Sequence, residues 1–258
     1  MAYILVMKPA AIKIARLHLA LPLLLLLGAV FLPAACAKKA MALPPDSSTE
    51  NTDTMTNTGG KKWLALGDSY TIGTSVKEAD RYTEQTIALL NAQSIRMANA
   101  TIIATNGWTT GDLMAAVRDK PVSTDYDVVS LLIGVNNQYR GGSIEEYRQQ
   151  FTVLLQRSIQ LANGQPGHVV VLSIPDYSVT PFASGSNKQQ IAREIDAFNE
   201  VNKMIAADYK VHYLYITTES RKSAADPSLV AADGLHFSGK EYAAWSQLLA
   251  PLIKPLLQ

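Results

Sequence analysis

The sequence lacks the residues and motifs on which several large protein classes depend. Its 258 residues include a single cysteine, Cys36, which excludes an internal disulfide and a cysteine-rich zinc site. It has no H-E-x-x-H zinc motif, no G-x-x-x-x-G-K-[ST] phosphate loop and no G-x-S-x-G turn of the larger α/β-hydrolases. Charged residues make up 17% of the chain and the net charge is +1, so we expect no nucleic-acid partner. The 48% of apolar residues is instead typical of a globular protein with a sizeable core.

The longest apolar run lies close to the N-terminus, at residues 19–32. The run is interrupted by Pro22 and is shorter than the roughly 20 residues that span a membrane. Basic but no acidic side chains occur in the first 35 residues, so we predict a signal peptide over residues 1–35. Its end, L-P-A-A directly before Cys36, resembles a bacterial lipoprotein processing site. This resemblance predicts that Cys36 is lipidated and anchors the protein to a membrane.

Two alternatives to lipidation stay open. The residues around Cys36 also form an A-x-A site, and cleavage after Ala37 would release a secreted protein. The segment could also stay uncleaved as an anchor. The solitary cysteine at this position favours lipidation, although Pro33 takes a place that the usual pattern gives to leucine. All three interpretations predict an extracytoplasmic protein, either anchored in the periplasm or at the cell surface, or secreted.

The rest of the chain divides into a polar segment and one α/β domain. Residues 36–62 are rich in Pro, Ser, Thr, Asn and Gly without apolar periodicity, which predicts a flexible linker. Within residues 63–258, short apolar runs predict strands at residues 63–66, 94–104, 127–133, 168–174 and 211–216. Helical spacing predicts helices at residues 81–93, 110–118, 143–162, 188–207 and 238–257. Strands that alternate with helices imply a parallel sheet covered on both faces.

Four short motifs lie mostly where ligands bind in such sheets, beyond the carboxyl ends of the strands. The first, Gly-Asp-Ser-Tyr at residues 67–70, follows the first strand. A serine beside a glycine at this position is well placed to be a nucleophile. The other motifs are Asn-Gly-Trp at 106–108, Gly-Val-Asn-Asn at 134–137 and Asp-Gly-Leu-His at 233–236. We expect the fourth motif to open the last helix.

Taken in this order, the four motifs resemble those of the SGNH, or GDSL-type, hydrolase family. The resemblance covers essentially all of residues 63–257. It implies a three-layer α/β/α sandwich with about five parallel strands in flavodoxin-like order. It also implies a serine mechanism that uses no metal and no cofactor.

The resemblance assigns a role to one residue or more of each motif. Ser69 would be the nucleophile, His236 the base that takes its proton, and Asp233 the carboxylate that orients the imidazole. The oxyanion hole would consist of the backbone N–H groups of Ser69 and Gly107 and the side-chain amide of Asn136. Glycine suits a backbone donor because the missing Cβ lets the main chain approach the substrate.

The individual residues have plainer interpretations as well. Asp233 could cap the last helix, Asn136 could be a turn residue, and His236 could be a surface histidine. Two positions also depart from the family pattern, which has Leu or Ile in place of Tyr70 and aspartate in place of Asn137. We expect Tyr70 to alter the acyl pocket and Asn137 to affect the local loop geometry.

Several aromatic residues fall in loops that follow strands or close to the motifs. They could line a substrate pocket or simply pack these loops. These candidates are Tyr70, Trp108, Tyr139, Tyr177 and Phe182.

The family resemblance implies hydrolysis of a carboxylic ester through an acyl-enzyme. We favour a lysophospholipase, thioesterase or arylesterase-like activity on a small acyl-ester or lipid substrate, with the lipid anchor as the membrane contact. One alternative is a carbohydrate O-acetylesterase, since an extracytoplasmic tether also suits an enzyme that works on an acetylated glycan. Another is a non-catalytic binding module that keeps the fold.

Overall fold

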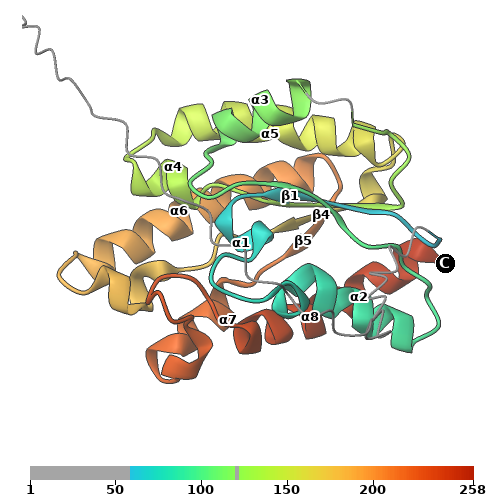
Figure 1. Cartoon of the computed structure of the whole chain (residues 1–258). Coiled ribbons are helices and arrows are strands. Elements are labelled where there is room, and N and C mark those ends of the chain that lie inside the picture. Colours follow the sequence, from blue (N-terminus) through green and yellow to red (C-terminus); the bar gives the residue numbers. More distant parts are fainter. Residues whose placement is uncertain (1–58, 120–121) are drawn as a thin grey trace, which may run out of the picture. The chain divides into compact units, whose positions relative to one another are not determined.

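A computed structural model describes residues 59–119 and 122–258 (Figure 1). Cys36, the predicted signal peptide and most of the predicted linker therefore lie outside the described residues. The last two linker positions are hydrogen-bonded to the domain: the Lys61 N–H donates to the Arg96 carbonyl at 2.8 Å, and the Lys62 N–H donates to Asp127 Oδ2 at 2.8 Å. Among the helices that the structure describes, none is long and apolar enough to cross a membrane.

One parallel sheet forms the centre of the described chain. Its five strands are β1 (Trp63–Gly67), β2 (Thr101–Ala104), β3 (Val128–Leu132), β4 (Val169–Leu172) and β5 (His212–Leu214). They lie in the order β2-β1-β3-β4-β5, which is the flavodoxin-like order, so the fold prediction is confirmed. The three inner strands are buried along their whole length, which explains their nearly continuous apolar sequences.

Helices cover both faces of the sheet (Figure 1). Two helices pack together on one face, α2 (Tyr82–Ala92) and α8 (Gly239–Ile253). The other face carries α3 (Thr110–Asp119), α5 (Ile144–Leu161) and α6 (Lys188–Asp208), with α5 in contact with the other two. The described residues also form three short α-helices, α1 (Ser69–Ile72), α4 (Val135–Tyr139) and α7 (Thr217–Arg221), and several 3-10 turns. The domain is therefore the three-layer α/β/α sandwich that the sequence predicts.

The ends of two helices show how local chemistry sets their limits. The Ser143 hydroxyl accepts a hydrogen bond from the Glu146 N–H at 3.1 Å and so caps α5, as the sequence predicts. The last helix is shorter than predicted, because α8 ends at Ile253 and a 3-10 turn, Lys254–Leu257, follows. Pro255 lies in the first positions of this 3-10 turn, where its missing N–H and fixed φ fit.

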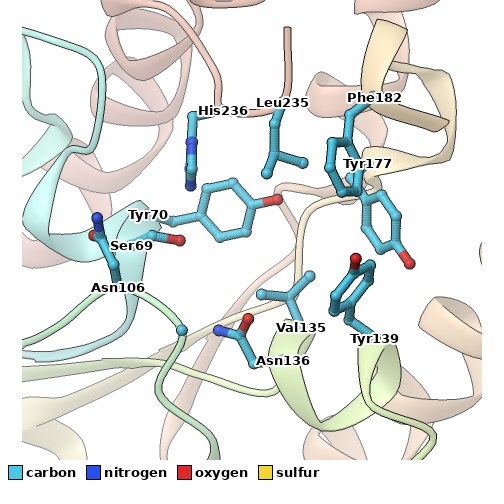
Figure 2. Close-up of a pocket in the computed structure, with 11 residues that line it drawn as sticks. Ser69, Tyr70, Asn106, Val135, Asn136, Tyr139, Tyr177, Phe182, Leu235 and His236 are labelled. Carbon is cyan, nitrogen blue, oxygen red and sulfur yellow. The ribbon is translucent and has the colours of Figure 1, made fainter. Parts of the chain in front are cut away.

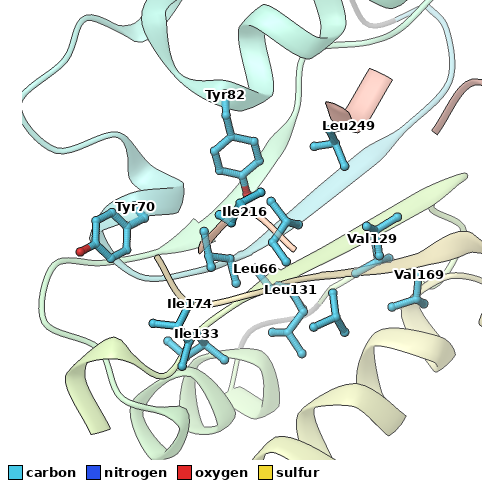
Figure 3. Close-up of a cluster of buried hydrophobic side chains, with 14 of the residues drawn as sticks. Leu66, Tyr70, Tyr82, Val129, Leu131, Ile133, Val169, Ile174, Ile216 and Leu249 are labelled. Atoms are coloured by element: carbon cyan, nitrogen blue, oxygen red, sulfur yellow. The ribbon is translucent and has the colours of Figure 1, made fainter. Parts of the chain in front are cut away.

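A continuous apolar core fixes the strands that carry the motifs (Figure 3). Trp63 of β1 is fully buried, and its indole N–H donates to the Ser130 hydroxyl on β3 at 3.0 Å. Tyr82 of α2 and Trp245 of α8 pack against each other on the face of the sheet that these two helices cover, with ring centroids 6.1 Å apart. Burial of each large aliphatic or Phe side chain of this core contributes about 1.5–3 kcal/mol, so the core holds β1 and β3 firmly together.

Candidate active site

Ser69 is placed by the turn that leads from β1 into α1. Gly67 ends the strand, and the Asp68 carboxylate caps α1 by accepting a hydrogen bond from the Tyr70 N–H at 3.1 Å. Ser69 is the first residue of the helix and is only 6% exposed. The carboxyl end of the strand therefore presents the Ser69 hydroxyl to a cavity, as the sequence predicts.

Asp68 itself is enclosed by the protein. Its side chain is buried, and Oδ2 finds no hydrogen-bond partner among the described residues. Burial raises the pKa of Asp68 to about 7, against the weaker opposing effect of the hydrogen bond from Tyr70. Asp68 thus differs from an ordinary helix-capping aspartate, which is ionised at neutral pH.

Asp233 and His236 form a compact hydrogen-bonded turn. Asp233 Oδ2 lies 2.6 Å from His236 Nδ1, and Oδ1 accepts hydrogen bonds from the backbone N–H groups of Leu235 and His236, both at 2.9 Å. Because an ionised carboxylate only accepts, Nδ1 carries the proton and Nε2 is free to act as a base. The His236 side chain is 12% exposed and faces the cavity, so it is not a surface histidine (Figure 2).

The fourth motif does not open the last helix, which corrects that expectation. Asp233 does not cap α8 either, because Ser238 is the residue that precedes its first turn. The motif instead forms a turn in which the Ala231 N–H donates to the His236 carbonyl at 2.8 Å. This turn directs both polar side chains of the motif toward the loops that follow β1.

Asp233 stays ionised despite its partial burial. Burial alone would raise its pKa, but hydrogen bonds from Ser75, His236 and two backbone N–H groups outweigh burial and hold the pKa of Asp233 well below its usual range. The carboxylate is therefore negative at neutral pH. It can orient the imidazole and stabilise an imidazolium ion.

The hydrogen bond from Ser75 to Asp233 is not evident from the sequence. Its hydroxyl donates to Asp233 Oδ2 at 2.5 Å, so this oxygen accepts from both Ser75 and His236. The backbone of Ser75 has φ +68°, a left-handed conformation that residues other than glycine rarely adopt. The neighbouring Thr74 hydroxyl donates to Asn106 Oδ1. The loop after α1 therefore joins the first, second and fourth motifs.

Gly107 and Asn136 lie opposite the imidazole. Gly107 has φ +79°, which only glycine adopts readily, and its carbonyl accepts a hydrogen bond from Arg140 Nη2 at 2.7 Å. Asn136 belongs to α4 and is not a turn residue. Its Nδ2 donates one hydrogen to the Trp108 carbonyl at 3.0 Å, which leaves the second hydrogen available.

The first and last residues of the third motif, Gly134 and Asn137, fix α4 in place. Gly134 precedes the helix with φ +134°, and a Cβ there would lie 2.7 Å from atoms of both Ile174 and Tyr147. The Asn137 side chain accepts from the Thr110 N–H at 3.0 Å and donates to the Thr110 hydroxyl at 2.7 Å. The asparagine that replaces the usual aspartate thus ties α4 to the start of α3.

Ser69, Gly107, Asn136 and His236 line one cavity of about 230 Å³ (Figure 2). The cavity has a polar end at these four residues and an aromatic end. Four of the five predicted pocket residues line it, namely Tyr70, Tyr139, Tyr177 and Phe182. Asn106, Val135 and Leu235, which belong to the second, third and fourth motifs, complete the lining.

Trp108 is the exception and corrects the prediction. It does not line the cavity, because its side chain packs against the apolar core while its carbonyl accepts from Asn136.

Tyr70 forms the wall between the two ends of the cavity. Its ring lies edge to face with the His236 imidazole at 5.7 Å between centroids and packs against Phe237 at 5.8 Å. Burial raises the pKa of Tyr70 well above its usual value, so it remains a neutral phenol. The bulky residue at this position therefore narrows the pocket and packs against the imidazole.

The described residues contain no cluster of three or more His, Cys, Asp or Glu side chains that could hold a metal ion.

Comparison with known proteins defines the class. The model of the GDSL-like lipase/acylhydrolase family matches residues 65–244, and the chain belongs to this family. The family assignment confirms the resemblance to SGNH hydrolases and the prediction that the protein is an acyl hydrolase.

Solved structures with the same fold are distant in sequence. TesA is 19% identical, with 76% of this chain and 99% of that chain covered and a TM-score of 0.58. Axe2, an acetylxylan esterase from Geobacillus stearothermophilus, is 20% identical, with coverages of 79% and 96% and a TM-score of 0.57. A lipase/acylhydrolase from Enterococcus faecalis is 18% identical, with coverages of 76% and 96% and a TM-score of 0.59. A comparison with curated proteins finds no match.

Proposed function

We propose that the protein hydrolyses carboxylic esters through a covalent acyl-enzyme formed on Ser69. One observation carries this proposal. Ser69, His236, Gly107 and Asn136 line a single cavity, and Asp233 Oδ2 lies 2.6 Å from His236 Nδ1, which leaves Nε2 for the reaction. A nucleophile, a base with its orienting carboxylate and a set of oxyanion donors are the parts that acyl transfer requires.

The proposed reaction has two halves. In the first, Ser69 Oγ attacks the ester carbonyl carbon as His236 Nε2 takes its proton, and the imidazolium then gives this proton to the departing alcohol. In the second, Nε2 takes a proton from water, the resulting hydroxide attacks the acyl-enzyme, and the acid leaves as Ser69 regains its proton. Asp233 holds the imidazole in the required tautomer throughout.

Negative charge forms on the former carbonyl oxygen in both halves. The backbone N–H groups of Ser69 and Gly107 and the free hydrogen of Asn136 Nδ2 are the donors that we propose for it. Each such donor typically lowers the barrier by about 3–4 kcal/mol. Arg140 and Trp108 hold this arrangement, since Arg140 binds the Gly107 carbonyl and the Trp108 carbonyl binds Asn136.

We infer that the ester carries a small or medium-sized acyl group, because the cavity volume of about 230 Å³ lies below the roughly 300–1,000 Å³ of a typical small-molecule site. An acetylated glycan is supported as a substrate by the similarity to Axe2, which is an acetylxylan esterase. The lysophospholipid and thioester substrates that the sequence favours have no comparable support from the cavity.

We further propose that the enzyme acts outside the cytoplasm as a lipoprotein anchored through Cys36. The support is the sequence around this cysteine, which lies outside the described residues. Replacement of Cys36 by alanine should move the protein from the membrane fraction to the soluble fraction. Unchanged fractionation of Cys36→Ala would contradict lipidation.

A fluorophosphonate probe tests the proposed nucleophile. The full-length protein should be labelled and should hydrolyse p-nitrophenyl acetate, and Ser69→Ala should lose both properties. Ser123→Ala, which removes an exposed serine outside the cavity, is the matched control and should retain both. Labelling that persists in Ser69→Ala would show that another residue is the nucleophile.

A further inference from the structure

A second hollow adjoins the aromatic end of the catalytic cavity. It has a volume of about 350 Å³ and shares Tyr139 and Tyr177 with the catalytic cavity. Figure 2 shows these two tyrosines beside Phe182, on the opposite side of the cavity from Ser69. A substrate bound at Ser69 can therefore extend past the tyrosines into the hollow.

The hollow is lined mainly by hydrogen-bonding side chains. Gln138 comes from α4, Ser186 and Asn187 precede α6, and Gln190 and Glu194 lie on the first two turns of α6. Hydroxyl and amide groups at these positions suit a polar alcohol part of the ester substrate. A fatty acyl chain would instead displace the water from these groups without replacing its hydrogen bonds.

Glu194 is held ready to accept hydrogen bonds. Gln138 Nε2 donates to Glu194 Oε2 at 2.7 Å, and Gln190 Nε2 donates to Oε1 at 2.8 Å. The hydrogen bond from Gln138, and to a smaller extent the one from Gln190, lowers the pKa of Glu194 below its ordinary value. The side chain is therefore a carboxylate. Each of its oxygens keeps a further acceptor site for a ligand hydroxyl.

An aromatic surface connects the hollow to the catalytic cavity. Tyr139 is 58% exposed and Phe182 is 45% exposed, although large aromatic side chains usually gain by burial. Their ring centroids lie 5.9 Å apart, and each lies 6.2 Å from that of Tyr177. The ring planes are tilted to one another by 49–72°, so the rings present separate faces at an angle rather than one flat surface. The exposed face of Tyr139 or of Phe182 suits the apolar C–H face of a sugar ring.

The charges around the two cavities exclude an anionic group from this position. Neither lining includes a lysine or an arginine, and the charged side chain in the hollow is the Glu194 carboxylate. Arg140 is close to Gly107, but it is engaged with the Gly107 carbonyl and lies 3.8 Å from Asp112. A phosphate in the hollow would therefore face the Glu194 carboxylate with no cation in the lining, since Arg193, which acts electrostatically on Glu194, lies outside it.

We propose that the hollow is a subsite for a neutral sugar unit, and that the natural substrate is an oligosaccharide carrying a short acyl ester. This inference rests on the proposed esterase function. The acylated sugar would lie over the tyrosines with its ester at Ser69, and the adjacent sugar would fill the hollow with its hydroxyls on Glu194 and Gln190. A cavity of 230 Å³ that also holds a sugar ring leaves room for a short acyl group only.

Substrate comparison on the full-length protein tests the subsite. We would measure kcat and KM for acetylated xylo-oligosaccharides and p-nitrophenyl acetate in Glu194→Ala, Gln190→Ala and Tyr139→Ala. Each variant should lower kcat/KM for the oligosaccharide about tenfold more than for p-nitrophenyl acetate, mainly through KM, because each removes a contact to the sugar. The matched controls are Glu200→Ala, on the same helix, and Tyr215→Ala, another exposed tyrosine. Neither residue lines the catalytic cavity or the hollow, and both variants should match wild type.

Two outcomes would overturn the subsite while leaving the esterase intact. One is an equal loss on both substrates in the three variants. The other is wild-type activity on lysophosphatidylcholine that exceeds activity on the oligosaccharide. If the proposed esterase function is wrong, wild type will neither hydrolyse p-nitrophenyl acetate nor be labelled by the probe.

A binding measurement keeps the subsite testable in that case. The oligosaccharide should bind Ser69→Ala in calorimetric titration, and adding Glu194→Ala should weaken this binding about tenfold. Absence of binding, or binding that Glu194→Ala does not change, would refute the subsite.

Discussion

Asp68 directly precedes Ser69, and Asp233 lies three residues before His236. The two aspartates differ in how many hydrogen-bond donors surround the carboxyl group. Asp233 has four hydrogen-bond donors on its two oxygens, whereas Asp68 has one donor and a buried Oδ2 without a partner. The pKa of Asp233 is lowered and that of Asp68 is raised to about 7.

The difference shows that burial alone does not decide the charge of a carboxyl group. Partial burial raises the pKa of Asp233 too, but the donors reverse the effect. We infer a division of tasks: Asp233 supplies a permanent charge to the imidazole, and Asp68 shapes the turn that presents Ser69. The charge of Asp233 should therefore matter for activity, and that of Asp68 mainly for stability.

The largest expected effect is that of Asp233→Asn. An asparagine can keep the two backbone contacts through Oδ1, but its NH2 group then replaces Oδ2 and accepts from neither Ser75 nor His236, so the imidazole is left in the wrong tautomer. We expect kcat for p-nitrophenyl acetate to fall about 10³–10⁴-fold with little change in KM. Asp226→Asn, which changes an exposed aspartate paired with Lys240, is the control and should keep wild-type kcat. A loss below tenfold in Asp233→Asn would remove this residue from the proposed triad.

The next largest effect is the change in the pH dependence of stability that we expect for Asp68→Asn. Because the pKa of Asp68 is raised to about 7 in the folded protein from an ordinary value of 3.8, the folded state binds the proton more tightly than the unfolded state. The stability that this proton provides is fully present below about pH 4 and is lost as pH rises through 7. Asparagine mimics the protonated acid and keeps the acceptor for the Tyr70 N–H.

Asp68→Asn should therefore match wild type at pH 4 and exceed it at pH 8, by at most about 4 kcal/mol of unfolding free energy. Thermal unfolding midpoints across this range measure the difference. Wild type should lose stability in the same window from Glu241 as well, whose pKa burial raises to about 7, so the variant will retain some pH dependence. Parallel curves for the two proteins would show that Asp68 does not ionise in this range, and the contrast with Asp233 would be lost.

The sequence predicts the layers and the order of this fold because long apolar runs and helical periods are strong signals. It misses α1, α4 and α7, which span four or five residues and have no period to detect. It also places the end of the last helix too late, although Pro255 marks the position. The short elements depend on single contacts, such as the cap that Asp68 provides, and such contacts are not visible in a sequence.

The same reasoning explains which site residues the sequence finds. The four motifs indicate Ser69 and His236 because their position after strands predicts where the chain converges. The lining of the cavity is harder to predict, since Trp108 and Phe182 look alike in sequence but only Phe182 faces the cavity. Ser75 and Glu194 carry no pattern at all, because their roles come from contacts between segments that are far apart in the chain.

The smallest effect, and the one that sharpens the contrast most, is that of Ser75. Its hydroxyl is one of the donors that distinguish Asp233 from Asp68, so both Ser75→Ala and Ser75→Gly should lower kcat about tenfold and leave KM unchanged. The two variants should differ in stability. Glycine accepts the left-handed backbone that Ser75 adopts at φ +68°, whereas alanine does not, so Ser75→Gly should be more stable than Ser75→Ala by about 1 kcal/mol.

Ser94 provides the matched control, because it has nearly the same left-handed backbone, at φ +64°, and lines no part of the cavity. Its glycine and alanine variants should differ from each other in stability as those of Ser75 do, but both should keep wild-type kcat. If the Ser75 variants change only stability, Ser75 is a strained loop residue without influence on the imidazole. If kcat falls equally in Ser75→Ala and Ser75→Gly, the lost hydroxyl and not the backbone is the cause, and Ser75 acts as a positioning residue for Asp233.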